Sequence, residues 1–221
     1  MNQLLQITLI ASLLVILCLG QKSLVTFKEF EKAFTSTGYT KPTKEQYDAF
    51  VQGLPKGLIT TKEEAAMALA HFLHESLGLS KKIEIQCKDT GCPGEYRVPG
   101  CDSPDKGYFG RGYIQLSWCY NYKDASHDLY GDDRLVNDPD MVAREESVAW
   151  DTAFWFWKSR VHSKPEVAQG AFGVTTRAIN GGLECDNPGG HQLAKKRFEM
   201  YNKIRAAFGL KGAGKEQGCY N

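Results

Sequence analysis

The chain has 221 residues, of which 42% are hydrophobic and 24% charged, and its formal net charge is +1. The charges are spread evenly, which argues against a nucleic-acid partner or an anionic membrane surface and favours a neutral substrate. No proline- or serine-rich linker, low-complexity tract or internal repeat divides the sequence, so we expect one well-cored domain.

The first twenty residues, "MNQLLQITLIASLLVILCLG", contain no charged side chain and end at the small residue Gly20. This pattern is typical of a secretory signal peptide, although the missing positive n-region leaves an uncleaved amino-terminal anchor as the alternative. No second apolar run approaches the length of a membrane span. We therefore expect a signal peptide over residues 1–20, a mature domain over residues 21–221, and a secreted, extracellular monomer without membrane attachment after cleavage.

Three threonines each precede a Glu or Gln by three positions: Thr26 in "TFKE", Thr43 in "TKEQ" and Thr61 in "TKEE". This spacing is the capping box, in which two side chains satisfy free amides at the start of a helix, so three helices should begin there. The third should run through "AAMALAHFLHE", with Gly78 placed to stop it. Glu75 then lies in its last turn.

The middle of the sequence changes character. Residues 87–108 are rich in Gly, Pro and Cys and predict an irregular loop, and "GYFGRGYIQLSW" then predicts a short strand or hairpin. Two later segments, "SVAWDTAFWFWKSRV" and "HQLAKKRFEMYNKIRAAFGL", have helical length and apolar spacing, so the fold should be mainly α. The "FWFW" run at 154–157 could stack on a sugar, but aromatic residues all round a helix are more typical of a buried one.

Cys18 would leave with the signal peptide, so the mature chain would keep six cysteines. An even number in a secreted chain favours disulfides, and no C-x-x-C pair with a histidine partner indicates a zinc site. We expect neither metal nor cofactor, and spacing alone leaves the connectivity open. The six are Cys87, Cys92, Cys101, Cys119, Cys185 and Cys219.

Glu75 is unusual because it follows an alanine-rich, apolar helix. On that helix it shares a face with Ala68 and with His71 or Phe72, so its carboxyl should emerge from an apolar surface. Desolvation and the negative end of the helix dipole should both raise its pKa and prepare it to donate a proton. The alternative is a plain contact with His71, four residues earlier.

Glu84 follows nine residues later, in "KKIEIQ", where Lys81 and Lys82 should keep it ionised. An ionised carboxylate can activate water. Two carboxyls with unlike surroundings are what cleavage of a glycosidic bond requires: one protonates the leaving oxygen and the other acts on the opposite face. On spacing alone, an ordinary ion pair between Glu84 and either lysine is the more common explanation.

Four segments change this balance: "HFLHES", "YFGRGYIQLSWCYNY", "AWDTAFWFW" and "INGGLEC", with "RFEMY" near the carboxyl end. In these segments, and in their order, the chain resembles the chitinases of glycoside hydrolase family 19. The resemblance implies a lysozyme-like, two-lobed helical domain with a small β-hairpin beside the cleft. It also implies an endochitinase that cleaves β-1,4 bonds between N-acetylglucosamine units with inversion, acting on chitin or chitooligosaccharides.

The resemblance also implies roles for single residues. Glu75 would be the general acid, Glu84 the base that activates water, and Ser117 a group that orients this water. Glu95, in "CPGEYR", is the rival base, because the loop that carries the base varies in length within the family.

A second set of residues would bind sugar: Tyr108, Gln115, Asn121 and Asn180. Behind the acid, Glu184 and Arg197 would form a pair in which a guanidinium held by two carboxylates fixes Glu75. Without the resemblance, the first set would be ordinary turn and strand residues and the pair a helix-tethering salt bridge.

The resemblance further implies disulfides between Cys185 and Cys219 and between Cys92 and Cys101, with Cys87 and Cys119 as the remaining pair.

Two other functions remain open. A peptidoglycan hydrolase could use the same fold and acids on alternating sugars, and a chitin-binding defence protein could have kept the cleft but lost turnover. The presence of both acids favours an enzyme.

Overall fold

A computed structural model describes residues 23–103 and 105–221, so the expected signal peptide lies outside the described part. The described fold is mainly helical, as predicted, and none of its helices is long and apolar enough to cross a membrane. The helices are α2 (Phe27–Ser36), α3 (Lys44–Gly53), α4 (Lys62–Glu75), α5 (Cys119–Tyr130), α6 (Arg134–Asn137), α7 (Met141–Arg144), α8 (Glu146–Phe156), the π-helix η1 (Trp157–His162), α9 (Pro165–Ala168), α10 (Phe172–Glu184), the 3₁₀-helix η2 (Pro188–Gly190) and α11 (His191–Ala207).

The first three helices begin at the predicted threonines. Thr26 and Thr43 each form a complete capping box at the start of α2 and α3. Thr61 caps α4 by accepting a hydrogen bond from the backbone N–H of Glu64, but the Glu64 carboxylate turns inward instead of returning to the cap. There it accepts a hydrogen bond from Trp157 Nε1 at 2.9 Å, so a buried polar contact replaces half of the box.

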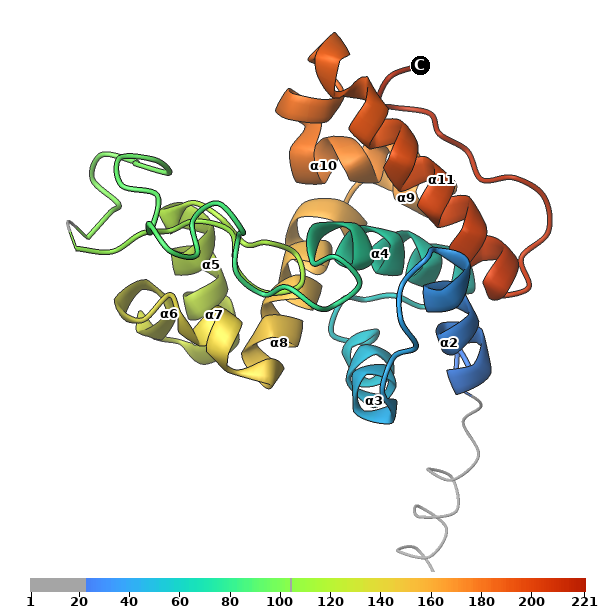
Figure 1. Ribbon diagram of the computed structural model, residues 1–221, viewed down its shortest axis with the longest axis horizontal. Helices are drawn as coiled ribbons and strands as arrows, with labels where there is room; N and C mark the ends of the chain where they lie inside the picture. Colours follow the sequence, from blue (N-terminus) through green and yellow to red (C-terminus); the bar gives the residue numbers. More distant parts are fainter. Residues whose placement is uncertain (1–22, 104) are drawn as a thin grey trace, which may run out of the picture.

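Helix α4 is the central helix of the domain. Every side chain from residue 65 to residue 73 is fully buried, and α11 and α10 pack against it (Figure 1). Its alanines suit this position because small side chains let neighbouring helices approach closely. The helix ends at Glu75, as predicted, and Gly78 then takes a left-handed conformation with φ +71°. Glu75 therefore lies at the edge of the hydrophobic core, directly after the fully buried part of α4.

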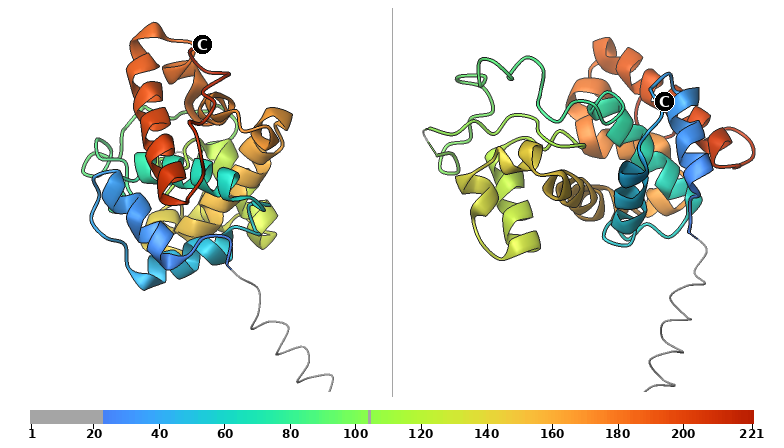
Figure 2. Two further views of the ribbon diagram at one scale, coloured as in Figure 1. Left: turned by 90° about the vertical axis from the view of Figure 1, so that its right-hand side faces the viewer. Right: turned by 60° about the horizontal axis from the view of Figure 1, so that its bottom comes forward.

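The domain has two lobes, as predicted. One contains α2, α3, α4, α10 and α11, and the other contains α5, α6, α7 and the long loop before them (Figures 1 and 2). Helix α8 lies between the lobes and packs against α3, α5 and α7. A single hydrophobic cluster includes Phe72 and Phe154 together with Tyr122 and Leu135 of the second lobe. The lobes are therefore parts of one core.

The aromatic run at 154–157, which spans the end of α8 and the start of η1, belongs mainly to this core, as expected. Phe154 and Trp157 are fully buried and Trp155 nearly so. Only Phe156 is partly exposed. The run therefore stabilises the junction between the lobes.

The predicted hairpin is short. Arg111 forms one antiparallel bridge with Leu116 and another with Ile83. The chain turns sharply between the bridged residues, with left-handed φ angles of +73° at Gly112 and +51° at Gln115. In the described residues the hairpin therefore consists of single bridges and not of extended strands.

All six cysteines of the described residues are bonded, and Cys185 pairs with Cys219 as the resemblance implies. The other two implied pairs are wrong: Cys87 bonds to Cys92, and Cys101 bonds to Cys119. The segment from residue 87 to residue 92 folds back on itself, with the Gly91 N–H donating to the Cys87 carbonyl at 2.7 Å. This turn places the two Cα atoms 4.8 Å apart and leaves Cys101 to bond at the start of α5.

We predict that loss of the Cys185–Cys219 bridge destabilises the domain more than loss of Cys87–Cys92. The first closes 34 positions and the second only 5, so the entropy that each removes from the unfolded chain corresponds to about 4 and about 2 kcal/mol. Denaturant unfolding of the two double Cys→Ala variants measures the difference. Equal losses would contradict this account.

Candidate active site

A cleft with a volume of about 860 Å³ lies where the two lobes meet. The end of α4, the loop over residues 84–96, the hairpin and the start of α5 line one part, and η1 and α10 line the rest. Most of the predicted site side chains meet here: Glu75, Glu84, Gln115, Ser117, Asn121 and Asn180, together with the rival Glu95.

Behind the cleft, Arg197 joins two carboxylates. Its Nη2 lies 2.5 Å from Glu75 Oε1 and 2.6 Å from Glu184 Oε1, and its Nε donates to both oxygens of Glu184. Arg197 and Glu184 are each 1% exposed, whereas Glu75 is 17% exposed. The three side chains therefore meet as the resemblance implies, and only Glu75 reaches the cleft.

One cation shared by two carboxylates separates their proton affinities. Burial raises the pKa of Glu75, and the negative charges of Glu184 and Glu84 add to this effect against the opposing charge of Arg197. Burial also acts to raise the pKa of Glu184, but the Arg197 and Asn180 hydrogen bonds outweigh it, so this pKa is lowered. The arrangement favours an ionised Glu184 and a protonated Glu75.

His71 holds the other side of the guanidinium. Burial lowers its pKa, so the ring is neutral, and its Nδ1 accepts a hydrogen bond from Arg197 Nη1 at 3.2 Å. Its Nε2 then donates to Thr175 Oγ1 at 2.8 Å. Both ring nitrogens of His71 are thus bonded, one to Arg197 and the other to Thr175. Neither contacts Glu75, which was the alternative role considered from the sequence.

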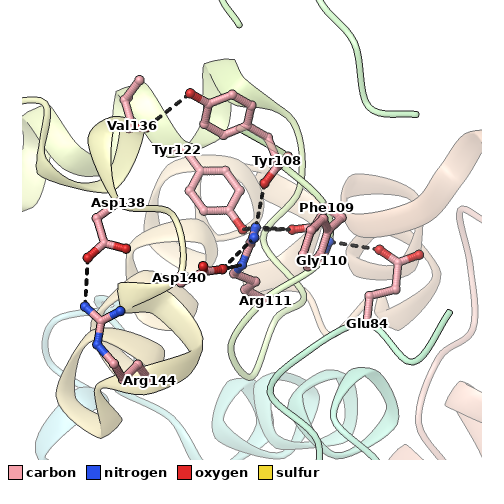
Figure 3. A network of polar contacts seen from close by, with 11 residues as sticks. Glu84, Tyr108, Phe109, Gly110, Arg111, Tyr122, Val136, Asp138, Asp140 and Arg144 are labelled. Carbon is pink, nitrogen blue, oxygen red and sulfur yellow. Dashed lines mark hydrogen bonds and ion pairs between the residues drawn. The ribbon is translucent and has the colours of Figure 1, made fainter. Parts of the chain in front are cut away.

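Glu84 is surrounded by hydrogen-bond donors. Gln86 Nε2 and the Tyr96 hydroxyl donate to its Oε1 at 3.0 and 2.8 Å. The Gly110 N–H donates to its Oε2 at 2.9 Å, a contact that Figure 3 shows. An ionised carboxylate, which only accepts hydrogen bonds, matches this set of donors. Neither Tyr96 nor Gly110 was identified from the sequence, although both are near predicted residues.

The prediction that Lys81 and Lys82 keep Glu84 ionised by pairing with it is wrong. Lys82 Nζ lies 2.9 Å from Glu146 Oε2, because the start of α8 offers it a carboxylate of its own. Within residues 23–103 and 105–221, no ion pair with Lys81 or Lys82 involves Glu84. Neutral donors take their place.

The backbone at Gly110 lies very close to Glu84. The Glu84 N–H donates to the Gly110 carbonyl at 2.9 Å, so one residue holds both the backbone and the side chain of Glu84. A Cβ at this position would lie 2.8 Å from Gln115 Oε1 and 3.2 Å from Glu84 Oε2. A larger residue would therefore have to displace the Gln115 amide and crowd the Glu84 carboxylate, so glycine suits this position.

Three other predicted polar side chains are hydrogen-bonded beside the cleft: Ser117 and Asn121 to backbone carbonyls, and Asn180 to Glu184. Ser117 Oγ donates to the Gln115 carbonyl, and Asn121 Nδ2 donates to the Ser117 carbonyl, each at 2.9 Å. Asn180 lies at a kink in α10, with φ −143° and ψ 34°, and donates to Glu184 Oε1 at 2.8 Å. The kink lets one asparagine line the cleft and contact the buried carboxylate.

Tyr108 does not line the cleft, which corrects the predicted sugar contact. It is 1% exposed, and its hydroxyl donates to the Val136 carbonyl at 3.1 Å inside the second lobe. Trp118 and Tyr120, which are 38% and 45% exposed, present the aromatic surface of the cleft instead. Both residues lie in the segment "YFGRGYIQLSWCYNY", but the sequence alone does not show which of its aromatic side chains are exposed.

Three non-glycine residues of the cleft wall have left-handed backbones: Tyr96, Gln115 and Trp118, with φ +56°, +51° and +72°. Such conformations cost free energy and persist where the surrounding structure enforces them, often at functional sites. The presence of three such residues on one wall is consistent with a functional role for this cleft.

We predict that Glu184→Gln lowers the pKa of Glu75. The substitution removes one neighbouring negative charge and leaves Arg197 to Glu75, and both changes favour the ionised acid. NMR titration of the Glu75 side-chain carboxyl carbon measures the shift.

The matched control is Glu63→Gln. Glu63 also pairs with an arginine, Arg205, but it lies twelve residues earlier on α4, about 18 Å along the helix. The control should leave the Glu75 titration unchanged. A Glu75 pKa that rises or stays constant in Glu184→Gln would contradict the shared-cation interpretation.

Known proteins share this sequence and architecture. Endochitinase At2g43610 of Arabidopsis thaliana is 40% identical over 186 residues, which are 81% of this chain and 62% of that protein. Acidic endochitinase SP2 of Beta vulgaris is 40% identical over 152 residues, 67% of this chain and 50% of that protein. The chain thus spans about half to three fifths of the length of these curated relatives.

Solved structures agree. Chitinase C from Streptomyces griseus HUT6037 superposes with a TM-score of 0.69 at 27% identity, covering 88% of this chain and 97% of that one. A class IV family 19 chitinase from Zea mays gives 0.67 at 28% identity, covering 90% and 98%. The sequence model of the family described as "Chitinase class I" matches residues 23–217. The chain therefore belongs to glycoside hydrolase family 19.

Proposed function

We propose that the protein is a secreted endochitinase that hydrolyses β-1,4 bonds between N-acetylglucosamine units with inversion, as a monomer without metal or cofactor. The observation that carries the proposal is that two carboxyls with unlike surroundings, Glu75 and Glu84, line one cleft. The relatives named above are called endochitinases, which supports the same reaction. All of the proposed site residues come from a single chain.

Glu75 would act as the general acid. Its raised pKa keeps a proton available, and this proton passes to the glycosidic oxygen as the bond from that oxygen to the anomeric carbon breaks. The carboxylate left behind faces Arg197 Nη2, so the guanidinium stabilises the charge that develops during bond cleavage. Arg197 thereby favours the transition state over the bound substrate.

Glu84 would act as the base. A water molecule attacks the anomeric carbon from the face opposite Glu75, and its proton passes to Glu84, so the product has the inverted configuration. Ser117, which also lines the cleft, would help to orient this water. Solvent then returns a proton to Glu75 and removes one from Glu84, which completes the cycle.

The charges of the cleft favour chitin over peptidoglycan. Its acidic lining residues are Glu75, Glu84 and Glu95, and its one lining cation among the described residues, Arg160, pairs with Asp124 at 2.5 Å. The lactyl carboxylate of a muramyl sugar would meet negative charge with no free cation. Uncharged N-acetylglucosamine avoids this cost.

The remaining lining suits such a sugar. Polar amides and hydroxyls can bond to N-acetyl and hydroxyl groups, and the exposed rings of Trp118 and Tyr120 offer stacking surfaces. Three disulfides also support secretion, because such bonds persist in oxidising compartments.

Glu75→Gln should leave folding and oligomer binding nearly intact while kcat falls by at least about 10²- to 10⁴-fold, because the amide keeps the shape but has no acidic proton. Hydrolysis of a chitin hexamer measures turnover, and calorimetry on the variant measures binding. Activity above a tenth of wild type in a folded variant would exclude Glu75 as the acid. In the wild type, faster release from bacterial walls than from chitin oligomers would favour a peptidoglycan hydrolase.

The base is tested by comparing Glu84→Gln with Glu95→Gln. Glu95 also lines the cleft, but it is exposed, whereas Glu84 is held by three donors. We expect Glu84→Gln to lose most turnover and Glu95→Gln to keep it, and proton NMR of fresh product to show the α-anomer. Loss in the Glu95 variant alone would move the base to Glu95, and initial β-anomer would overturn inversion.

A further inference from the structure

The peptide group between Phe109 and Gly110 is hydrogen-bonded on both edges. Its N–H, which belongs to Gly110, donates to Glu84 Oε2 at 2.9 Å. Its carbonyl, which belongs to Phe109, accepts from the Tyr122 hydroxyl at 2.8 Å and from Arg111 Nη1 at 3.3 Å. Figure 3 shows Glu84 on one side of this peptide and the two donors on the other.

Arg111 is a fixed cation behind this peptide. The residue is 3% exposed, its guanidinium stacks 3.7 Å from the Phe109 ring centroid, and Nη1 also donates to the Gly107 carbonyl and the Tyr122 hydroxyl at 2.9 and 3.0 Å. Its Nε and Nη2 lie 2.8 and 2.7 Å from Asp140 Oδ1. The Asp140 side chain is 68% exposed, so water screens the counter-charge more than the buried guanidinium.

We propose that Arg111 and Tyr122 are positioning residues for Glu84 and that they act through the Phe109–Gly110 peptide. Neither side chain lines the cleft, so neither can act on substrate directly. Two donors on the carbonyl polarise the peptide and make its N–H a stronger donor, since hydrogen bonds in a chain reinforce one another in a low-dielectric interior. This inference rests on the proposed role of Glu84 as the base.

The same donors fix the orientation of the peptide. Glycine permits many backbone conformations, so a peptide that precedes Gly110 could rotate about its flanking bonds. A reversed peptide would place the Phe109 carbonyl against the Glu84 carboxylate, with two acceptors facing each other. Rotation would also break the bonds from Tyr122 and Arg111, and these bonds therefore hold the base in place.

The variant that tests this is Tyr122→Phe, with Tyr108→Phe as its matched control. The two rings pack edge to face with centroids 5.4 Å apart, and the hydroxyl of each donates to a backbone carbonyl. Each variant loses one hydrogen bond from a phenolic hydroxyl to a backbone carbonyl in the same lobe, but only Tyr122 bonds to the peptide that holds Glu84. Tyr122→Phe also removes the acceptor of one Arg111 Nη1 hydrogen bond, and Arg111 belongs to the same proposed positioning group.

On a chitin hexamer, Tyr122→Phe should lower kcat by roughly three- to tenfold with KM unchanged, the loss expected when the hydrogen bond to the Phe109 carbonyl is removed. Tyr108→Phe should stay within about twofold of wild type. Arg111→Lys, which keeps the cation but loses the guanidinium fork, should lower kcat at least as far as Tyr122→Phe. Equal kcat in the two Tyr→Phe variants, or a change in KM alone, would overturn the proposal.

A double-mutant cycle separates this inference from the proposed function. In a Glu84→Gln background, Tyr122→Phe should produce no further fall in the residual kcat, because the group through which it acts is gone. A further fall of the same size would overturn the inference while leaving Glu84 as the base. Wild-type activity in Glu84→Gln would overturn the base assignment, and the positioning role with it.

The polarised peptide also has a readout that does not depend on activity. The Gly110 amide proton should move upfield in the NMR spectrum of Tyr122→Phe, because its hydrogen bond to Glu84 weakens, and should stay in place in Tyr108→Phe. An unshifted Gly110 proton in Tyr122→Phe would contradict the proposed route.

Discussion

The buried guanidinium of Arg197 is the interaction on which the candidate site depends. A cation taken out of water needs partners, and Arg197, on α11, finds them on two other helices: Glu75 at the end of α4 and Glu184 on α10. Because one cation serves two carboxyls in a dry environment, the charge is balanced only when one of them holds a proton. Burial raises the pKa of Glu75 and the charge of Glu184 adds to this rise, whereas hydrogen bonds from Arg197 and Asn180 outweigh burial and lower the pKa of Glu184.

The two cleft carboxyls are held by different means. Glu75 emerges from the helical core and meets a cation directly, whereas Glu84 lies on a loop and meets only neutral donors. Arg111 is the cation that we propose positions Glu84, and the Phe109–Gly110 peptide group lies between the two side chains. A direct ion pair would compete with the proton that a base must accept, and a peptide between cation and carboxylate supplies orientation without that direct competition.

The sequence predicted those features that depend on local pattern. The threonine caps, the end of α4 beside Glu75 and the buried aromatic run follow from spacing and helical period, and the meeting of Glu184 with Arg197 followed from the family resemblance. Apart from the incomplete capping box at Thr61, the errors fall in one segment, residues 82–119, which has no such period. There the cysteine pairs, the partner of Lys82 and the direction of Tyr108 depend on the path of the loop. The role of Arg111 could not be predicted from the sequence, where it is simply an arginine between two glycines. Its counter-charge, Asp140, is 29 positions away.

This segment also explains how a cleft wall can be stable without a large core. Its own hydrophobic cluster centres on Cys87, Cys92 and Phe109, far fewer residues than the cluster beneath the helical wall. Two disulfides, the guanidinium of Arg111 and bonds to backbone carbonyls replace the missing packing. Such a wall has few buried apolar contacts to break, so it opens at lower free energy than the helices opposite. We therefore expect the loop wall to deform more readily than the helical wall, while the buried Arg111 holds the peptide that contacts Glu84.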